Sequence, residues 1–218
     1  MGWFGQFYTS SIGKKFVMAL TGILLIIFLL IHLAGNLSLY GGENAFNSYA
    51  GALETFKPII RVIEVILALI FIFHIIHGVW TWIENKKAKP KGYAVNAKSK
   101  ESSIFSRTMI QSGSIIFIFL LIHLQTFWLP YNTGAEENLY SIVTGWFATA
   151  WYSWFYIFAM ILLGFHLNHG FQSAFQTFGW NHKKYFPLIQ KIGTIYAILM
   201  AVGFASLPIY FLFFHGGN

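Results

Sequence analysis

Apolar residues fall into five long runs along the chain, and short polar connections separate them. The runs cover about residues 16–40, 59–82, 108–128, 148–175 and 188–214. Each is long enough to cross the hydrocarbon core of a bilayer, which is about 30 Å thick and takes roughly 20 helical residues. The pattern therefore predicts an all-α membrane protein, a five-transmembrane-helix bundle that forms a single integral membrane domain over residues 1–218.

Composition supports this class. The chain is 56% apolar and only 10% charged, which is too hydrophobic for an ordinary soluble domain. The net charge of +7 does not indicate nucleic-acid binding, because the basic residues lie in the connections between apolar runs. The absence of cysteine excludes disulfides, thioether-attached haem and an iron–sulfur cluster on this chain.

Charge in the connections predicts the orientation. Residues 86–107 carry one acid, Glu101, and a run of basic residues: Lys86, Lys87, Lys89, Lys91, Lys98, Lys100 and Arg107. Further lysines precede the first run (Lys14, Lys15) or flank the fourth connection (Lys183, Lys184, Lys191). By the positive-inside rule, the N-terminus and the second and fourth connections are cytoplasmic and the C-terminus lies outside.

The chain contains an internal repeat that carries histidines. Residues 28–33, FLLIHL, recur unchanged as residues 119–124, and residues 73–78, FHIIHG, are matched by FHLNHG at 165–170. His32 precedes His74 by 42 residues, and His123 precedes His166 by 43. The repeat is two spans long, so its copies share one orientation and are related by something close to a rotation about the membrane normal.

The repeated histidines sort into two depths. His32 lies about 27 Å beyond Lys14 at the helical rise, and His123 about 24 Å beyond Arg107, so these two form an outer pair. His74 and His166 lie closer to the cytoplasmic side and form an inner pair. A glycine stands ten residues before each outer histidine, at Gly22 and Gly113, and Thr21 or Ser112 precedes it. Such small residues either admit a cofactor edge or let helices pack closely.

Two pairs at two depths predict two stacked haems. Imidazole inside a membrane is costly and by default functional, and it is a good ligand for iron. Each iron would take imidazoles from two helices of the bundle, and with both axial positions filled the role is electron transfer. Zinc fits less well, because no carboxylate or thiolate cluster supports either pair. His77 and His169 remain alternatives to His74 and His166, whereas His182 and His215 are expected at the surface.

The chain resembles the dihaem cytochrome b subunit of succinate:quinone oxidoreductases and quinol:fumarate reductases over nearly its whole length. The likeness consists of five spans, one suitably placed histidine in each of the first four, and residues 43–48, ENAFNS, which are similar to the family's Ala-Phe-Asn-Ser stretch. In the family, glycine or alanine follows the second and fourth ligands by four residues. That pattern selects His74 with Gly78 and His166 with Gly170.

The resemblance implies a function. Two haem b groups, one on His32 and His123 and one on His74 and His166, would carry electrons across a bacterial cytoplasmic membrane. An iron–sulfur subunit would dock on the basic cytoplasmic surface, and a flavoprotein subunit with FAD would interconvert succinate and fumarate. Menaquinone would react near the outer face. This chain would then be an enzyme subunit that binds no dicarboxylate.

Two positions refine that expectation. Glu54 stands 22 residues after the first ligand, where the family's outer quinone site has a carboxylate that accepts a proton; a solvated surface glutamate is the alternative. Gly164 stands where some dihaem fumarate reductases carry a glutamate that helps to move protons across the membrane, which puts that pathway in doubt.

Two other functions remain open. A dihaem b anchor of another respiratory enzyme, such as a hydrogenase or formate dehydrogenase, would share the bundle and the haems. A small transporter that uses histidines as proton relays would lack haem altogether.

Overall fold

The computed structural model describes residues 2–88, 107–134 and 138–214. Within these ranges the chain is helical and has no strand, and five helices are long and apolar enough to cross a membrane, which confirms the all-α class and the number of spans. The elements are α1 (Trp3–Thr9), α2 (Ser11–Asn36), the 3₁₀ turn η1 (Leu37–Gly41), α3 (Gly42–Thr55), α4 (Lys57–Lys87), α7 (Met109–His123), the π-helical turn η2 (Leu124–Trp128), α8 (Leu129–Thr133), α9 (Leu139–Phe147), α10 (Ala150–Thr177) and α11 (Phe186–Phe213). The charged residues of 89–106 that support the predicted orientation, and His215, lie outside the described residues.

Local chemistry sets the helix ends. The Ser10 hydroxyl accepts a hydrogen bond from the Gly13 N–H at 3.0 Å and caps α2. Pro58 and Pro187 stand in the first turns of α4 and α11, where a missing N–H costs no hydrogen bond. Gly42, at φ 80°, takes a backbone conformation that other residues rarely adopt and turns the chain from η1 into α3. The predicted spans agree with the long helices to within a few residues.

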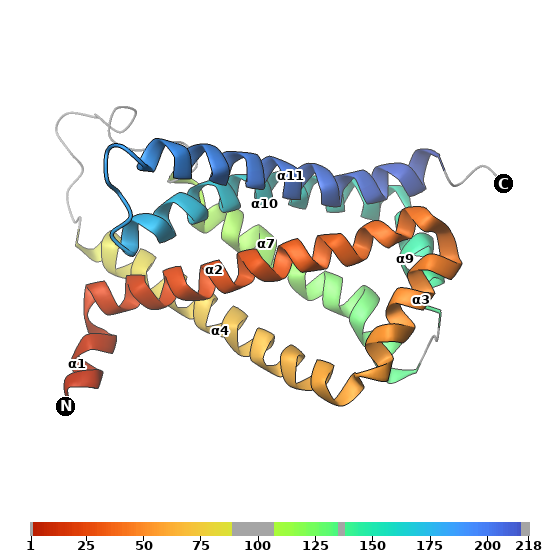
Figure 1. Cartoon of the computed structure of the whole chain (residues 1–218), viewed down its shortest axis with the longest axis horizontal. Coiled ribbons are helices and arrows are strands. Elements are labelled where there is room, and N and C mark those ends of the chain that lie inside the picture. Colours follow the sequence, from red (N-terminus) through yellow and green to blue (C-terminus); the bar gives the residue numbers. More distant parts are fainter. Residues whose placement is uncertain (1, 89–106, 135–137, 215–218) are drawn as a thin grey trace.

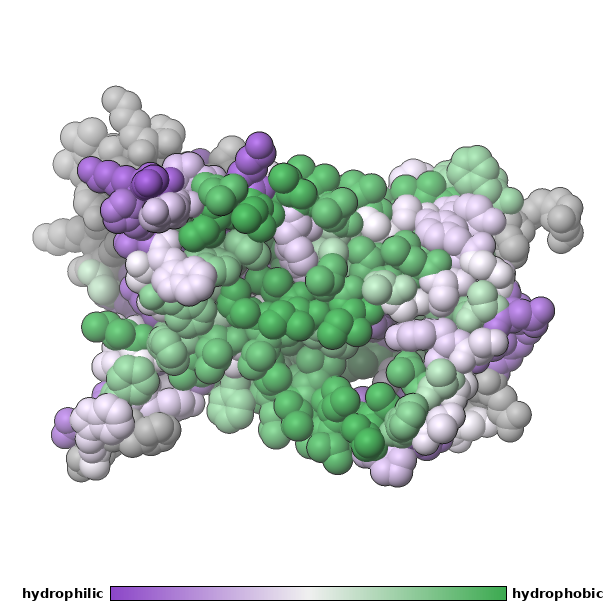
Figure 2. Space-filling view, viewed as in Figure 1, coloured by the Kyte–Doolittle hydropathy of each residue, from purple (hydrophilic) through white to green (hydrophobic). Residues whose placement is uncertain are grey.

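The five long helices run along the long axis of the molecule (Figure 1). The N-terminus, α1 and the connection from α10 to α11 lie at one end, which holds Lys14, Lys86, Lys87, Lys183 and Lys184. We call this the inner end, after the orientation that the charge pattern predicts, and the end closed by α3 and α9 the outer end. Figure 2 shows an apolar band between two more hydrophilic ends, as expected for a protein surrounded by lipid.

The packed core lies on one side of the bundle. α10 packs along α11 and α2, and the buried cluster includes Tyr152, Met160, Phe204, Leu207 and Phe211. Small residues let these helices approach closely: a Cβ added at Gly203 would lie 2.7 Å from the Leu33 side chain, and one at Gly164 would lie 3.0 Å from Ala201.

α4 stands apart from this core. It packs mainly against α2, and His77 is its one buried residue. α2 and α4 lie together at the inner end and diverge toward the outer end (Figure 1), and the space-filling view is hollowed between them there (Figure 2). The side of α4 that faces the bundle is therefore not covered by a packed protein core.

Candidate functional site

The outer pair of histidines meets between α2 and α7. The ring centroids of His32 and His123 are 5.9 Å apart and their planes are 85° apart. Aromatic side chains surround the pair: Phe28 stacks on His32 at 5.1 Å, and Phe119 lies 5.6 Å from the His123 ring. The predicted pairing of helices is thus present at this depth.

The inner pair meets between α4 and α10. The ring centroids of His74 and His166 are 6.3 Å apart, with the planes at 71°. Gly22 on α2 and Gly113 on α7 lie against these rings, since a Cβ added to them would sit 3.4 Å from His74 Cε1 and 3.5 Å from His166 Cε1. The two glycines of the repeat therefore make room beside the inner imidazoles in the same way in both copies.

Hydroxyl groups orient the inner histidines. Thr21 Oγ1 lies 3.2 Å from His74 Nδ1, and Ser112 Oγ lies 3.4 Å from His166 Nδ1. Thr21 already donates its hydroxyl hydrogen to the backbone carbonyl of Val17 at 2.8 Å, so it accepts from the His74 ring. Proton placement on Nδ1 leaves Nε2 with a lone pair, which is the state of a histidine that binds metal.

The spacing within both pairs suits one metal ion. Two imidazoles bound to opposite sides of one iron have centroids about 6 Å apart, because each metal–nitrogen bond is about 2 Å and the centroid lies about 1 Å further. No group of three or more His, Cys, Asp or Glu side chains within the described ranges gathers to hold a metal by itself. A pair of imidazoles supplies two ligands, so the remaining ligands would come from a porphyrin, and the histidine pairs fit haem b.

His77 does not face a second histidine. Its ring is fully buried, packs edge-on against Tyr8 at 5.3 Å, and places Nδ1 2.8 Å from the Phe73 carbonyl oxygen. Of the two candidates on α4, it is His74 that lies opposite His166. On α10, His166 takes that position, and His169 lies one turn further toward the inner end.

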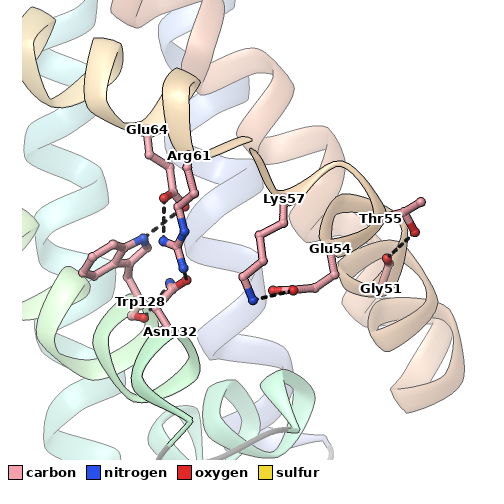
Figure 3. Close-up of polar contacts among 8 residues, drawn as sticks. All are labelled: Gly51, Glu54, Thr55, Lys57, Arg61, Glu64, Trp128 and Asn132. Atoms are coloured by element: carbon pink, nitrogen blue, oxygen red, sulfur yellow. Dashed lines mark hydrogen bonds and ion pairs between the residues drawn. The ribbon is translucent and has the colours of Figure 1, made fainter. Parts of the chain in front are cut away.

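Glu54 lies on α3 at the outer end, where its carboxylate accepts a 2.7 Å hydrogen bond from Lys57 (Figure 3). Both side chains are exposed, and Tyr131 on α8 lies close to the same carboxylate. The carboxylate is thus accessible at the outer end, as a quinone-site proton acceptor requires, but a surface ion pair has the same geometry.

A polar network that the sequence did not predict joins α4 to η2 and α8 nearby (Figure 3). Arg61 donates to Glu64 at 2.7 Å and also to the Asn132 side chain, and Trp128 Nε1 donates to Glu64 at 3.1 Å. The available signal was Glu64 itself, a carboxylate seven residues into an apolar helix, which in a membrane segment marks a partnered or functional group.

Gly164 lies where α10 packs against α11. Because an added Cβ would already meet Ala201 at 3.0 Å, a glutamate side chain has no room there without a shift of the helices. The packing agrees with the sequence in offering no carboxylate at this depth of α10.

Comparisons with protein-family models, curated proteins and solved structures give no match to this chain. The functional argument therefore depends on its own residues and their geometry.

Proposed function

We propose that this chain is the membrane-anchoring dihaem cytochrome b subunit of a succinate:quinone oxidoreductase or quinol:fumarate reductase. The observation that carries the proposal is the presence of two facing histidine pairs, His32 with His123 and His74 with His166, at the spacing of two axial ligands. A proton relay in a transporter would need no such repeated pairing of two imidazoles at two depths.

In this proposal, some residues bind the haem irons and others orient or shield the ligands. The four histidines would ligate two irons through Nε2, and Thr21 and Ser112 hold the inner rings in the tautomer that allows it. Phe28 and Phe119 shield the outer pair. Bound haem b would supply one-electron transfer between a cytoplasmic iron–sulfur subunit and menaquinone near the outer face.

The ends of the bundle suit different partners. The lysines of the inner end offer a basic surface to an iron–sulfur subunit, and a flavoprotein subunit with FAD beyond it would carry the dicarboxylate site. The orientation that goes with this arrangement places the N-terminus in the cytoplasm of a bacterium and the C-terminus outside its cytoplasmic membrane. At the outer end, Glu54 would accept a proton from menaquinol.

Haem content and partner identity test the proposal. The complex purified in mild detergent is expected to show a reduced-minus-oxidised b-type spectrum with two haems per chain, and to carry a flavoprotein with succinate dehydrogenase activity. A dihaem protein that co-purifies with a hydrogenase or formate dehydrogenase would assign the anchor to another enzyme. A colourless protein from haem-sufficient cells would exclude a cytochrome and favour a transporter.

A further inference from the structure

Two buried polar atoms on α4 have no hydrogen-bond partner among the residues that the structure describes. They are His77 Nε2 and Thr81 Oγ1, one helical turn apart. Buried polar groups are nearly always paired, because leaving one unpaired costs its full desolvation penalty. The pair therefore indicates a polar group that binds here and is not part of the polypeptide.

Thr81 differs from the other helical threonines in a specific way. Thr21, Thr126 and Thr177 each donate the hydroxyl hydrogen to the carbonyl four residues earlier, at 2.8 to 2.9 Å. Thr81 makes no such bond to His77, so its hydrogen is available to another acceptor. His77 holds its Nδ1 against the Phe73 carbonyl, which leaves Nε2 as its free nitrogen.

These atoms lie in line with a proposed haem ligand. His77 and Thr81 follow His74 by three and seven residues, or about 4.5 and 10 Å toward the inner end. Beyond them the buried Lys14 ammonium pairs with Glu84 at 2.5 Å. Polar side chains thus follow one another from the inner histidine pair to the inner end, along the side of α4 that faces α2.

The second repeat contains the same pair of chemical groups. On α10, His169 and Ser173 follow His166 by three and seven residues, so imidazole and hydroxyl recur in both copies at identical distances from the ligand. Because His74 and His166 lie opposite each other, the two pairs have the same register along α4 and α10 relative to these two histidines.

Resting on the haem assignment above, we propose that His77 with Thr81 and His169 with Ser173 bind the two propionates of the haem held by His74 and His166. Each copy of the repeat supplies one imidazole and one hydroxyl, so the two copies would offer one such pair to each of the two propionates. A carboxylate inside a membrane needs hydrogen-bond donors, and each hydroxyl supplies one while the imidazole shares a proton with the same carboxyl group. A buried water that bridges each pair is the competing occupant.

Single substitutions in the purified complex test this assignment. Thr81→Val and Ser173→Ala are expected to keep two haems per chain, to shift the propionate bending bands in the resonance Raman spectrum and to lower the midpoint potential of the inner haem. The potential falls because an unbonded carboxylate keeps more negative charge, which favours ferric iron. At a fixed ambient potential, each lost hydroxyl is expected to reduce the ratio of reduced to oxidised inner haem about tenfold. A change of this size corresponds to the free energy of one charge-assisted hydrogen bond.

Three controls separate the outcomes. Thr81→Ser retains the hydroxyl and should keep wild-type values, and Thr194→Val removes a hydroxyl on α11 that bonds to Gln190 and Asn168, without effect on either haem. The outer haem serves as an internal reference in every variant. Two-haem variants with unchanged Raman bands and potentials would overturn the propionate assignment in favour of buried water, whereas a colourless wild-type protein would overturn the haem assignment and this proposal together.

Discussion

Two hydroxyl groups determine which nitrogen of each inner histidine is available. Thr21 and Ser112 are the last residues before Gly22 and Gly113, and they lie one helix away from the rings that they contact. The sequence shows them as part of a repeat but not as partners of His74 and His166, because an interhelical contact depends on how α2 packs on α4 and α7 on α10. Spacing predicts that the histidines form two pairs, and the structure adds how each inner ring is held.

Loss of either hydroxyl is expected to weaken the inner haem site alone. Thr21→Val and Ser112→Ala should reduce haem retention there about tenfold, the lower end of what removal of such a supporting group costs a metal site. Haem titration of the haem-depleted protein measures this. Ser114→Ala is the matched control, since that hydroxyl bonds to its own helix at Ile110 and should leave both haems unchanged.

Sequence spacing leaves His74 and His77 as alternative ligands, and the fold favours His74 by placing it beside His166. His74→Ala is expected to leave one haem per chain, because His74 lies opposite His166. His77→Ala should keep both haems, since it removes neither member of the His74–His166 pair. Pyridine haemochromogen analysis of the two variants decides between them, and two haems in His74→Ala with one in His77→Ala would reverse the choice.

Glu54 is predicted to act on quinone and not on the haems. Glu54→Gln removes the proton acceptor and should lower turnover with a menaquinol analogue at least tenfold, while the reduced-minus-oxidised spectrum stays unchanged. Lys57→Gln is the control for the surface ion pair, because it removes the partner of Glu54 but leaves the carboxylate. Equal turnover in Glu54→Gln and the wild type would show that Glu54 is an ordinary surface residue and not the proton acceptor.

At the scale of helices, the long spans follow from hydrophobicity, and the short helices do not. α1, α3 and α9 lie at the two ends of the bundle, and their residues lack the apolar length that identifies a span. The third apolar run also changes geometry in a way that no periodicity shows. Directly after His123 the helix widens into the π-helical turn η2, which ends two residues before Pro130. Proline has no backbone N–H, so it interrupts the regular hydrogen bonding of the helix.

The network around Arg61 is expected to hold the outer half of α4 to η2 and α8. Glu64→Ala would leave Arg61 and Trp128 without their shared acceptor at the depth of the membrane, and should lower the midpoint of thermal unfolding by about 5 °C. Glu54→Ala provides the comparison, because the exposed pair with Lys57 contributes little to stability. Thermal scans in one detergent measure both, and equal midpoints would show that the network is not a structural link.

At the scale of the whole molecule, the packing is one-sided. α10, α11 and α2 share a close-packed core, whereas α4 reaches the rest of the bundle mainly through α2, and its bundle-facing side borders a hollow (Figure 2). Protein interiors are normally filled to crystal-like density, so on the proposed function the hollow beside α4 is where the haems would complete the packing. Haem would then serve as part of the core that positions α4.

That role predicts that haem loss loosens α4 before it affects α10 and α11. The chain has no cysteine, so spin labels can be placed at single engineered cysteines without background. Ile72→Cys on α4 and Phe158→Cys on α10 lie at exposed positions, and the distance distribution between their labels should be narrow with haem and broad after haem depletion. The pair Phe158→Cys and Leu199→Cys, across the α10–α11 contact, should stay narrow in both states. A distribution between α4 and α10 that does not change on haem depletion would mean that α4 is held by protein contacts alone, and that the hollow beside it is not shaped by a cofactor.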